Sequence, residues 1–119
     1  ALIDRAESLG MVVMAEVRTG EEADRALCAG ATVIAVNSWT FDTNSLNPAA
    51  FAEIAPGLPS AVIKISLGGV RTARDLIDAA SSGADAVLAA EAVMSSDDVT
   101  AATRRLAAAG QHPACPSRS

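Results

Sequence analysis

The chain repeats one short pattern, and this repeat constrains the fold more than any other feature. Residues 26–37 and residues 79–90 both read as the end of a helix, a Gly-Ala pair and an apolar strand, in the sequences ALCAGATVIAVN and AASSGADAVLAA. A helix that returns to a strand is the connection that parallel strands require. The repeat therefore predicts an α/β fold with a parallel sheet.

Strands and helices alternate along the rest of the chain. We predict strands at residues 11–17, 31–36, 61–67 and 84–90, and helices at residues 2–9, 19–29, 47–55, 72–82 and 96–109. Thr19 and Thr72 are the expected N-caps of two of these helices. Four strands are too few to close a barrel with a filled interior, so the pattern predicts either a small open sheet or half of an eight-stranded barrel.

The two ends of the sequence differ from its middle. The helical pattern at residues 2–9 has no capping signal before it, which indicates a boundary within a longer sequence. Residues 1–110 are predicted to form one domain, and residues 111–119 a polar, proline-containing tail. Arg104 and Arg105 lie toward the end of the last predicted helix, where positive charge favours the helix dipole.

Composition excludes several classes of function. The net charge of -5 disfavours nucleic acid and anionic membranes as partners. No apolar run reaches the roughly 18 residues of a membrane span. Cys28 and Cys115 have no metal, redox or disulfide spacing, and no dinucleotide-binding motif is present. We therefore expect no metal, no cofactor and a cytoplasmic location.

Residues 62–72 have the layout of a phosphate-binding loop. Their sequence, VIKISLGGVRT, reads as a buried strand, a glycine turn and a helix start. Backbone N–H groups at such a helix start bind phosphate well. However, Leu67 stands where a polar group would be expected, and a tight turn without a ligand explains the glycines equally simply.

Several further motifs complete a resemblance to a known family. They are Ala15-Glu16-Val17-Arg18-Thr19, Val36-Asn37-Ser38, Phe51-Ala52-Glu53-Ile54-Ala55-Pro56 and Gly69-Val70-Arg71. In their order and spacing they resemble the C-terminal half of indole-3-glycerol phosphate synthase, a TIM barrel of tryptophan biosynthesis, and would be barrel strands five to eight. The resemblance implies a lyase family that closes the indole ring of a carboxyphenylamino deoxyribulose phosphate with loss of carbon dioxide and water.

The resemblance assigns roles to residues on the first two of these strands. Glu16 matches the family's glutamate that interacts with substrate and with the catalytic lysines, and we take it as the vestigial catalytic candidate. Asn37 matches a substrate-binding asparagine, although Asn also suits the start of a turn. Trp39 occupies the substrate-binding position where the family has an arginine that holds the carboxylate, and a packing role suits it as well.

The last two strands depart further from the family pattern. Leu67-Gly68-Gly69 stands where the family has Glu-Ser-Gly, so a substrate-binding carboxylate and a hydroxyl are replaced. Gly68 and Gly69 remain candidates for phosphate binding, together with Ala90, which replaces a glycine, and Glu91. The two catalytic lysines belong to the family's first half, and Lys64 lies too early in its strand to replace them.

Three functions remain open at this stage. The first is a synthase-like half-barrel, impaired or inactive alone, that self-associates into a barrel-like homodimer and so covers its edges and inner face. The second is a fragment of the synthase that needs an N-terminal half from a complementary chain. The third is a phosphosugar- or phosphate-binding module without catalysis.

Overall fold

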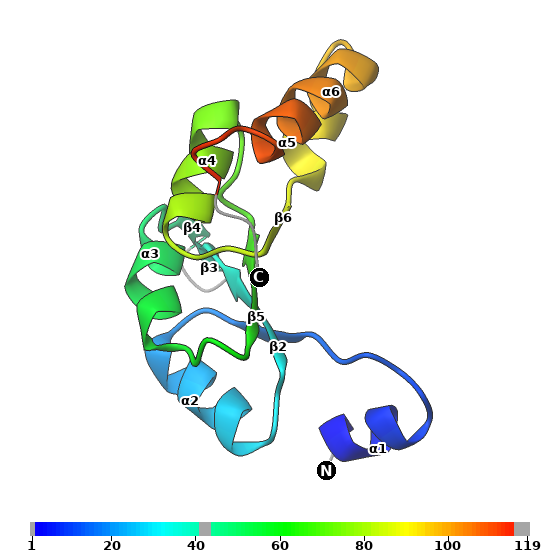
Figure 1. Cartoon of the computed structure of the whole chain (residues 1–119), viewed down its shortest axis with the longest axis vertical. Coiled ribbons are helices and arrows are strands. Elements are labelled where there is room, and N and C mark those ends of the chain that lie inside the picture. Colours follow the sequence, from blue (N-terminus) through cyan, green and yellow to red (C-terminus); the bar gives the residue numbers. More distant parts are fainter. Residues whose placement is uncertain (1, 41–43, 116–119) are drawn as a thin grey trace.

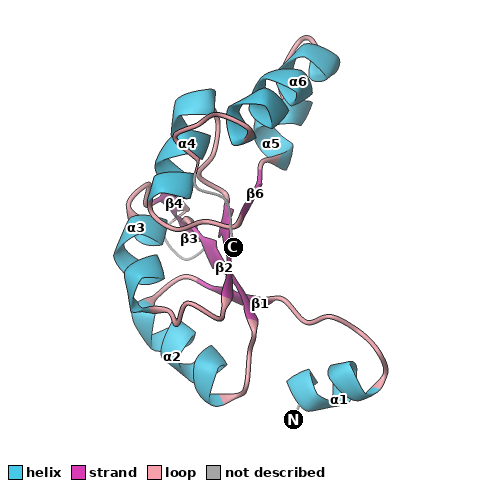
Figure 2. Ribbon diagram, viewed as in Figure 1, coloured by secondary structure: helices cyan, strands magenta, loops and turns pink. Residues whose placement is uncertain are grey.

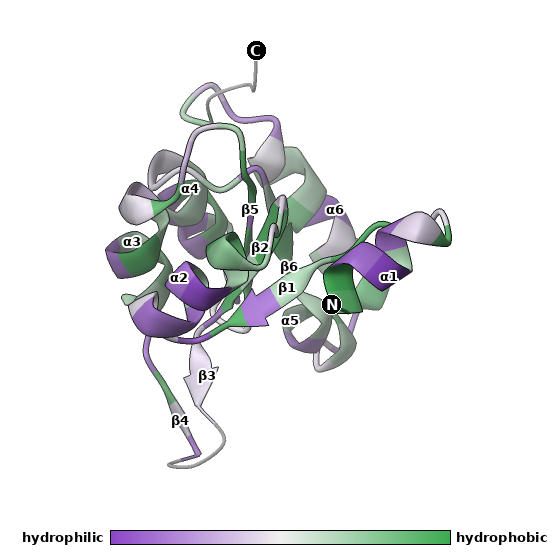
Figure 3. Cartoon of the chain, turned by 90° about the horizontal axis from the view of Figure 1, so that it is seen from below, coloured by the Kyte–Doolittle hydropathy of each residue, from purple (hydrophilic) through white to green (hydrophobic). Residues whose placement is uncertain are grey.

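The computed structural model describes residues 2–40 and 44–115. Its centre is a four-stranded parallel sheet in the order β1-β2-β5-β6 (Figure 2). The strands are β1 (Ala15–Val17), β2 (Val33–Asn37), β5 (Ile63–Leu67) and β6 (Ala86–Leu88). A separate two-stranded antiparallel ribbon, β3 (Trp39–Thr40) with β4 (Ser45–Leu46), extends away from this sheet (Figure 3).

Three of the connecting helices lie along one face of the sheet (Figure 1). They are α2 (Gly20–Cys28), α3 (Ala50–Ile54), which continues as the short 3-10 helix η1 (Ala55–Gly57), and α4 (Ala73–Ser81). The chain then forms α5 (Ala90–Met94) and α6 (Val99–Gly110) beyond β6. The first helix, α1 (Leu2–Ser8), lies on the opposite side of the sheet from α2, α3 and α4.

The strand register divides the sheet residues between two faces, because successive side chains of a strand point to opposite sides. Ile34 and Val36, both 0% exposed, face the helices and form the main core with Val17 and Phe51. A second cluster joins α4 to α6 through residues Val70, Leu76, Ala79 and Ala109. The core therefore lies between the sheet and its covering helices.

The other face is the inner face, defined here by Glu16, Val33, Ala35, Asn37, Ile63, Ile65, Leu67, Ala86 and Leu88. It keeps large apolar groups in contact with solvent: Ile63 is 40% exposed and Leu88 is 43% exposed. Within the described residues, β1 pairs only with β2 and β6 only with β5, so both edges of the sheet are unpaired. This is the predicted half-barrel, with the interior and the two seams of a complete barrel open.

The first strand is shorter than the sequence predicts. Pairing begins at Ala15, whose partner is Ile34, because β2 starts only at Val33 after the turn that follows α2. Met11 and Val12 therefore have no strand beside them and are 60% and 88% exposed. A run of apolar residues after Gly10 predicts an extended chain, but a neighbouring strand decides where the ladder begins.

Two further segments also differ from the predicted strands and helices. Between the predicted strand at residues 31–36 and the predicted helix at residues 47–55, where no strand was predicted, lies the β3–β4 ribbon, in which Trp39 pairs with Leu46. The strand predicted at residues 84–90 ends at Leu88, and Ala90 begins the short helix α5, which the sequence analysis missed. An alanine-rich run suits a helix as well as a buried strand, so composition alone does not separate the two here.

Both predicted N-cap residues, Thr19 and Thr72, cap their helices in the structure. Thr72 caps α4 through a complete capping box with Asp75. The Thr19 hydroxyl accepts a hydrogen bond from the Glu22 N–H at the start of α2, but the Glu22 carboxylate accepts from the Arg18 N–H instead of closing the box on Thr19. These caps fix where the chain leaves β1 and β5, and so fix the candidate site at those strand ends.

The first part of the tail lies against the domain. The Cys115 thiol donates to the Ala109 carbonyl at 3.3 Å, and Cys115 packs on the second core cluster. Residues 116–119 of the tail lie outside the described part of the chain.

Candidate functional site

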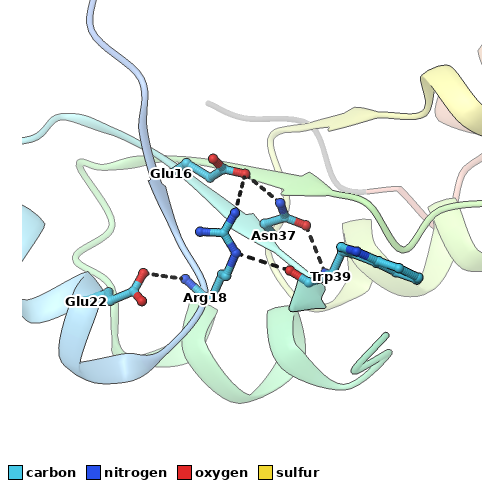
Figure 4. Close-up of polar contacts among 5 residues, drawn as sticks. All are labelled: Glu16, Arg18, Glu22, Asn37 and Trp39. Carbon is cyan, nitrogen blue, oxygen red and sulfur yellow. Dashed lines mark hydrogen bonds and ion pairs between the residues drawn. The ribbon is translucent and has the colours of Figure 1, made fainter. Parts of the chain in front are cut away.

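The carboxyl ends of β1 and β2 bring two of the predicted residues together. Glu16 and Asn37 both lie on the inner face, because Glu16 pairs with Ala35 and Asn37 follows two residues later. The Asn37 amide Nδ2 donates to Glu16 Oε1 at 2.5 Å (Figure 4). The two residues assigned to substrate therefore form one hydrogen-bonded pair.

Arg18 completes this pair from the segment that follows β1. Its Nη2 lies 3.6 Å from Glu16 Oε1, and its Nε donates to the Trp39 carbonyl at 3.2 Å (Figure 4). Arg18 belongs to one of the motifs of the family resemblance, but no role was predicted for it. The signal was present, because residues 16 and 18 share one face of a strand and carry opposite charges.

Asn37 also fixes the chain that follows it. Its Oδ1 accepts a hydrogen bond from the Trp39 N–H at 2.9 Å, the bond of an Asx turn. The same side chain thus starts a turn with its oxygen and holds Glu16 with its nitrogen. The turn that the sequence suggested at Asn37 is therefore present, and its role in binding substrate stays a prediction.

The hydrogen bond and the ion pair of Glu16 both involve the same carboxylate oxygen, so the other oxygen is available for chemistry. Both Asn37 and Arg18 contact Oε1, and within the described residues no bond to Oε2 is present. The carboxylate side chain is 40% exposed on the inner face. A carboxylate held by one oxygen can accept a hydrogen bond or a proton through the other.

Trp39 does not join this cluster through its side chain. Its backbone binds Arg18 and Asn37, whereas the indole points away from Glu16 (Figure 4). The residue is half-buried at the start of the β3–β4 ribbon. This placement suits the packing role.

Gly68 is held in a conformation that only glycine adopts easily. Its φ is +86°, and a Cβ added to it would lie 2.7 Å from Asn37 Oδ1. The neighbouring strands are joined at this point by the Ser38 N–H, which donates to the Leu67 carbonyl at 2.9 Å. A serine at position 68, as in the family pattern, would require the Asn37 side chain to move.

Most of the predicted phosphate-binding residues line one pocket of about 230 Å³ beside β6. Arg71 and Glu91 bring opposite charges to its wall, and the remaining lining is largely apolar, including Leu67 from the inner face. Gly69 is not part of this pocket; it lines a separate one with Ser38 on the helix side of the sheet. The predicted phosphate residues in the first pocket are Gly68, Ala90 and Glu91.

The remaining candidate groups have structural partners or no partners suited to a metal. Lys64 donates through Nζ to the carbonyls of Pro59 and Val62, both at 3.1 Å, so it is directed away from the inner face. Among residues 2–40 and 44–115, no group of three or more His, Cys, Asp or Glu side chains is placed to hold a metal ion. In the same residues, no helix is both long and apolar enough to cross a membrane.

Known proteins resemble the chain over nearly all of its length. A relative from Saccharopolyspora erythraea named indole-3-glycerol phosphate synthase is 51% identical over 119 residues, which is 100% of this chain and 44% of the relative. A Mycobacterium tuberculosis relative (strain CDC 1551) of the same name is 52% identical over 116 residues, 98% of this chain and 43% of the relative. The chain thus spans less than half the length of these relatives and matches their C-terminal part.

Solved structures share the fold with lower sequence identity. A thiamine phosphate pyrophosphorylase from Pyrococcus furiosus superposes with a TM-score of 0.72 at 21% identity, over 92% of this chain and 54% of that one. An N-acetylmannosamine-6-phosphate 2-epimerase from Clostridium perfringens gives 0.62 at 24% identity, over 76% and 41%. The model of the family described as indole-3-glycerol phosphate synthase matches residues 1–106. With the motifs, the half-barrel and this match in agreement, the chain belongs to the indole-3-glycerol phosphate synthase family.

Proposed function

We propose that this chain is the C-terminal half of an indole-3-glycerol phosphate synthase barrel, and that an N-terminal half, on the same polypeptide or another, completes it. The observation that carries the proposal is the open inner face between two unpaired edges, β1 and β6. An N-terminal half adds the four missing strands, pairs both edges and covers the inner face. The length of the curated relatives, less than half of which this chain spans, leaves room for that half.

The exposed apolar groups give this association its driving force. Fully burying a Leu or Ile side chain is worth about 1.5–3 kcal/mol. Ile63 and Leu88 on the inner face remain partly exposed, although α1 lies on this side of the sheet and its Ile3 packs against the main core. A partner that fills the interior gains this energy, together with the ladder hydrogen bonds of two edges.

In the completed barrel, the Glu16–Asn37 pair is the part of this chain that contacts substrate. Arg18 and Asn37 hold one carboxylate oxygen of Glu16, and Oε2 is left to act on a ligand in the interior. Catalytic lysines, which the family resemblance assigns to the first half, come from the partner. The chain alone is therefore inactive in this proposal.

The completed barrel is also a slow enzyme in this proposal. Trp39, Leu67 and Ala90 stand where the family pattern has an arginine, a glutamate and a glycine. Loss of one transition-state contact typically lowers the rate by about 10²- to 10³-fold, and losses within one catalytic unit do not add. Activity is therefore expected to be measurable but far below that of the relatives.

A chimera tests the proposal directly. The part of the Saccharopolyspora erythraea relative that this chain does not match is fused to Ala1, and synthase activity and cooperative unfolding are measured. We expect a folded barrel with low activity that Glu16→Gln lowers further. A folded but inactive chimera would contradict the catalytic part of the proposal, and a chimera without cooperative unfolding would contradict the half-barrel part.

Self-association is the second candidate, favoured by the strand order. Because β1 and β6 are both edges of one parallel sheet, β6 of one copy can pair with β1 of another, and a two-fold axis repeats the contact. Two copies then supply eight strands. Light scattering distinguishes this case, since a homodimer has twice the 12.0 kDa mass of the chain.

A further inference from the structure

A pocket of about 190 Å³ lies on the helix side of the sheet, with walls from α3 and α4. Its floor is formed by Ser66 on β5 and by Ser38, which follows β2. Ser66 is the register partner of Val36, which faces the helices, so this side of the strands is turned toward the pocket. Because one buried water needs roughly 10–15 Å³, the pocket has room for several waters or for a small organic molecule.

The floor carries two buried hydroxyl groups that the protein leaves without a partner. Ser38 and Ser66 are each 3% exposed, and within the described residues neither side chain forms a hydrogen bond. In the same part of the chain, every side-chain oxygen or nitrogen that is closed off from solvent has a partner, so both hydroxyl oxygens must reach the pocket. Gly69 keeps the first one uncovered, since a Cβ added there would lie 3.0 Å from Ser38 Oγ. A hydroxyl buried without a partner is unfavourable, so this floor is suited to a polar group in the pocket.

The wall that α4 contributes is acidic. Asp75 and Asp78 line the pocket, and none of the described residues around it is Lys, Arg or His. Asp78 is largely exposed and is paired with Arg74 at 3.0 Å. Asp75 is different, because its Oδ2 accepts the N–H groups of Arg71 and Thr72, both at 3.1 Å, while its Oδ1 has no partner among the described residues. The half-buried Asp75 carboxylate therefore leaves one negative oxygen available to a ligand.

The remaining lining decides between kinds of cation. Phe51, Val70 and Ala79 are buried and give the pocket an apolar wall, which suits an alkyl group. A divalent metal ion requires more anionic ligands than the pocket offers. Among residues 2–40 and 44–115, no three His, Cys, Asp or Glu side chains come together to hold one. The lining thus favours a small organic cation over a metal ion or an anion.

We propose that this pocket binds a primary alkylammonium ion. Its N–H groups donate to the hydroxyls of Ser38 and Ser66 and to Asp75 Oδ1, and its alkyl group packs on Phe51. An ammonium group has three donors and no acceptor, which matches a site made of acceptor oxygens. The pocket lies on the opposite face of the sheet from Glu16, so the proposal does not depend on the proposed function.

Titration of the whole chain with ethylammonium chloride, followed by amide chemical shifts, tests the site. We expect saturable binding in the millimolar range, with the largest shifts at residues 38, 66 and 75. Ser66→Ala is expected to weaken binding by about fivefold, since it removes one hydrogen bond. Asp75→Asn keeps an acceptor for the start of α4 but removes the charge, and is expected to weaken binding by about tenfold.

Matched controls separate this pocket from the rest of the surface. Ser81→Ala and Asp97→Asn change the same groups at exposed positions outside the pocket and are expected to change affinity less than about twofold. Ethanol, which lacks the charge, and tetramethylammonium, which lacks N–H donors, are expected not to saturate the site. Absence of saturation by ethylammonium would mean that the two hydroxyls hold only water and would overturn the proposal. Equal binding of ethanol, or equal effects of Asp75→Asn and Asp97→Asn, would also overturn it.

Discussion

The two halves of the candidate site differ in how completely their polar groups are connected. At the ends of β1 and β2, Glu16, Arg18 and Asn37 form a continuous network with the Trp39 backbone. At the ends of β5 and β6, Leu67 and Leu88 are paired neighbours, and the inner face carries no polar side chain there.

The isolated chain therefore maintains one part of the site and not the other. A polar network on the inner face persists where its members satisfy one another. On β5 and β6, the apolar side chains of the inner face remain partly exposed because no other surface of the described chain packs against them. The first region is therefore built within this chain, whereas the second depends on what fills the interior.

The largest effect is expected from truncating one apolar residue on each face of the sheet, Ile34 on the face that the helices cover and Leu88 on the inner face. Ile34 on β2 is 0% exposed, so Ile34→Ala should lower the free energy of unfolding by about 2–5 kcal/mol. Leu88 on β6 is 43% exposed, so Leu88→Ala should cost below about 1 kcal/mol. Urea unfolding measures both, and equal losses would contradict the view that the interior beside β6 is open.

A smaller effect is expected where the two regions meet. Gly68→Ala places a methyl group against Asn37 Oδ1 in a strained backbone conformation and should cost about 1–3 kcal/mol. Gly83 also has a positive φ, of +106°, but has no atom within 4 Å of an added Cβ, so Gly83→Ala is the matched control. The loss in the free energy of unfolding should be larger for Gly68→Ala than for Gly83→Ala. Equal losses would mean that the contact of the added methyl group with Asn37 does not change the free energy of unfolding.

The smallest effect is expected within the network itself. A double-mutant cycle of Glu16→Gln and Asn37→Ala should give a coupling of about 0.5–1.5 kcal/mol, because a partly exposed hydrogen bond has little net stability. The exposed Arg74–Asp78 pair, at 3.0 Å, is the comparison and should couple by about 0.3–0.5 kcal/mol. Coupling at Glu16 no stronger than at this surface pair would remove the distinction between the network and an ordinary ion pair.

The sequence predicted the fold because each strand and helix has a local signal. Gly-Ala pairs after helices and Thr caps before them located α2 and α4 to within one or two residues. The missed features depend on neighbours. Whether Met11 joins a ladder depends on where β2 starts, and whether Ala90 continues a strand depends on α5 packing beside α6.

The candidate site was predictable only in part for the same reason. Glu16 and Asn37 could be named because they match residues of the family resemblance, and the structure joins them by a hydrogen bond. The close approach of Gly68 to Asn37 links segments distant in sequence, which no local pattern encodes. Residue type suggested the chemistry, and only the pairing of β1, β2 and β5 supplied the geometry.

In the proposed barrel, an N-terminal half packs on the inner face and pairs with the edge strands β1 and β6. The most direct test mixes this chain with the part of the Saccharopolyspora erythraea relative that it does not match, and measures mass by light scattering on a sizing column. We expect a one-to-one complex, which neither component forms alone. Two separately eluting folded proteins, or a homodimer of this chain that the added half does not displace, would contradict it.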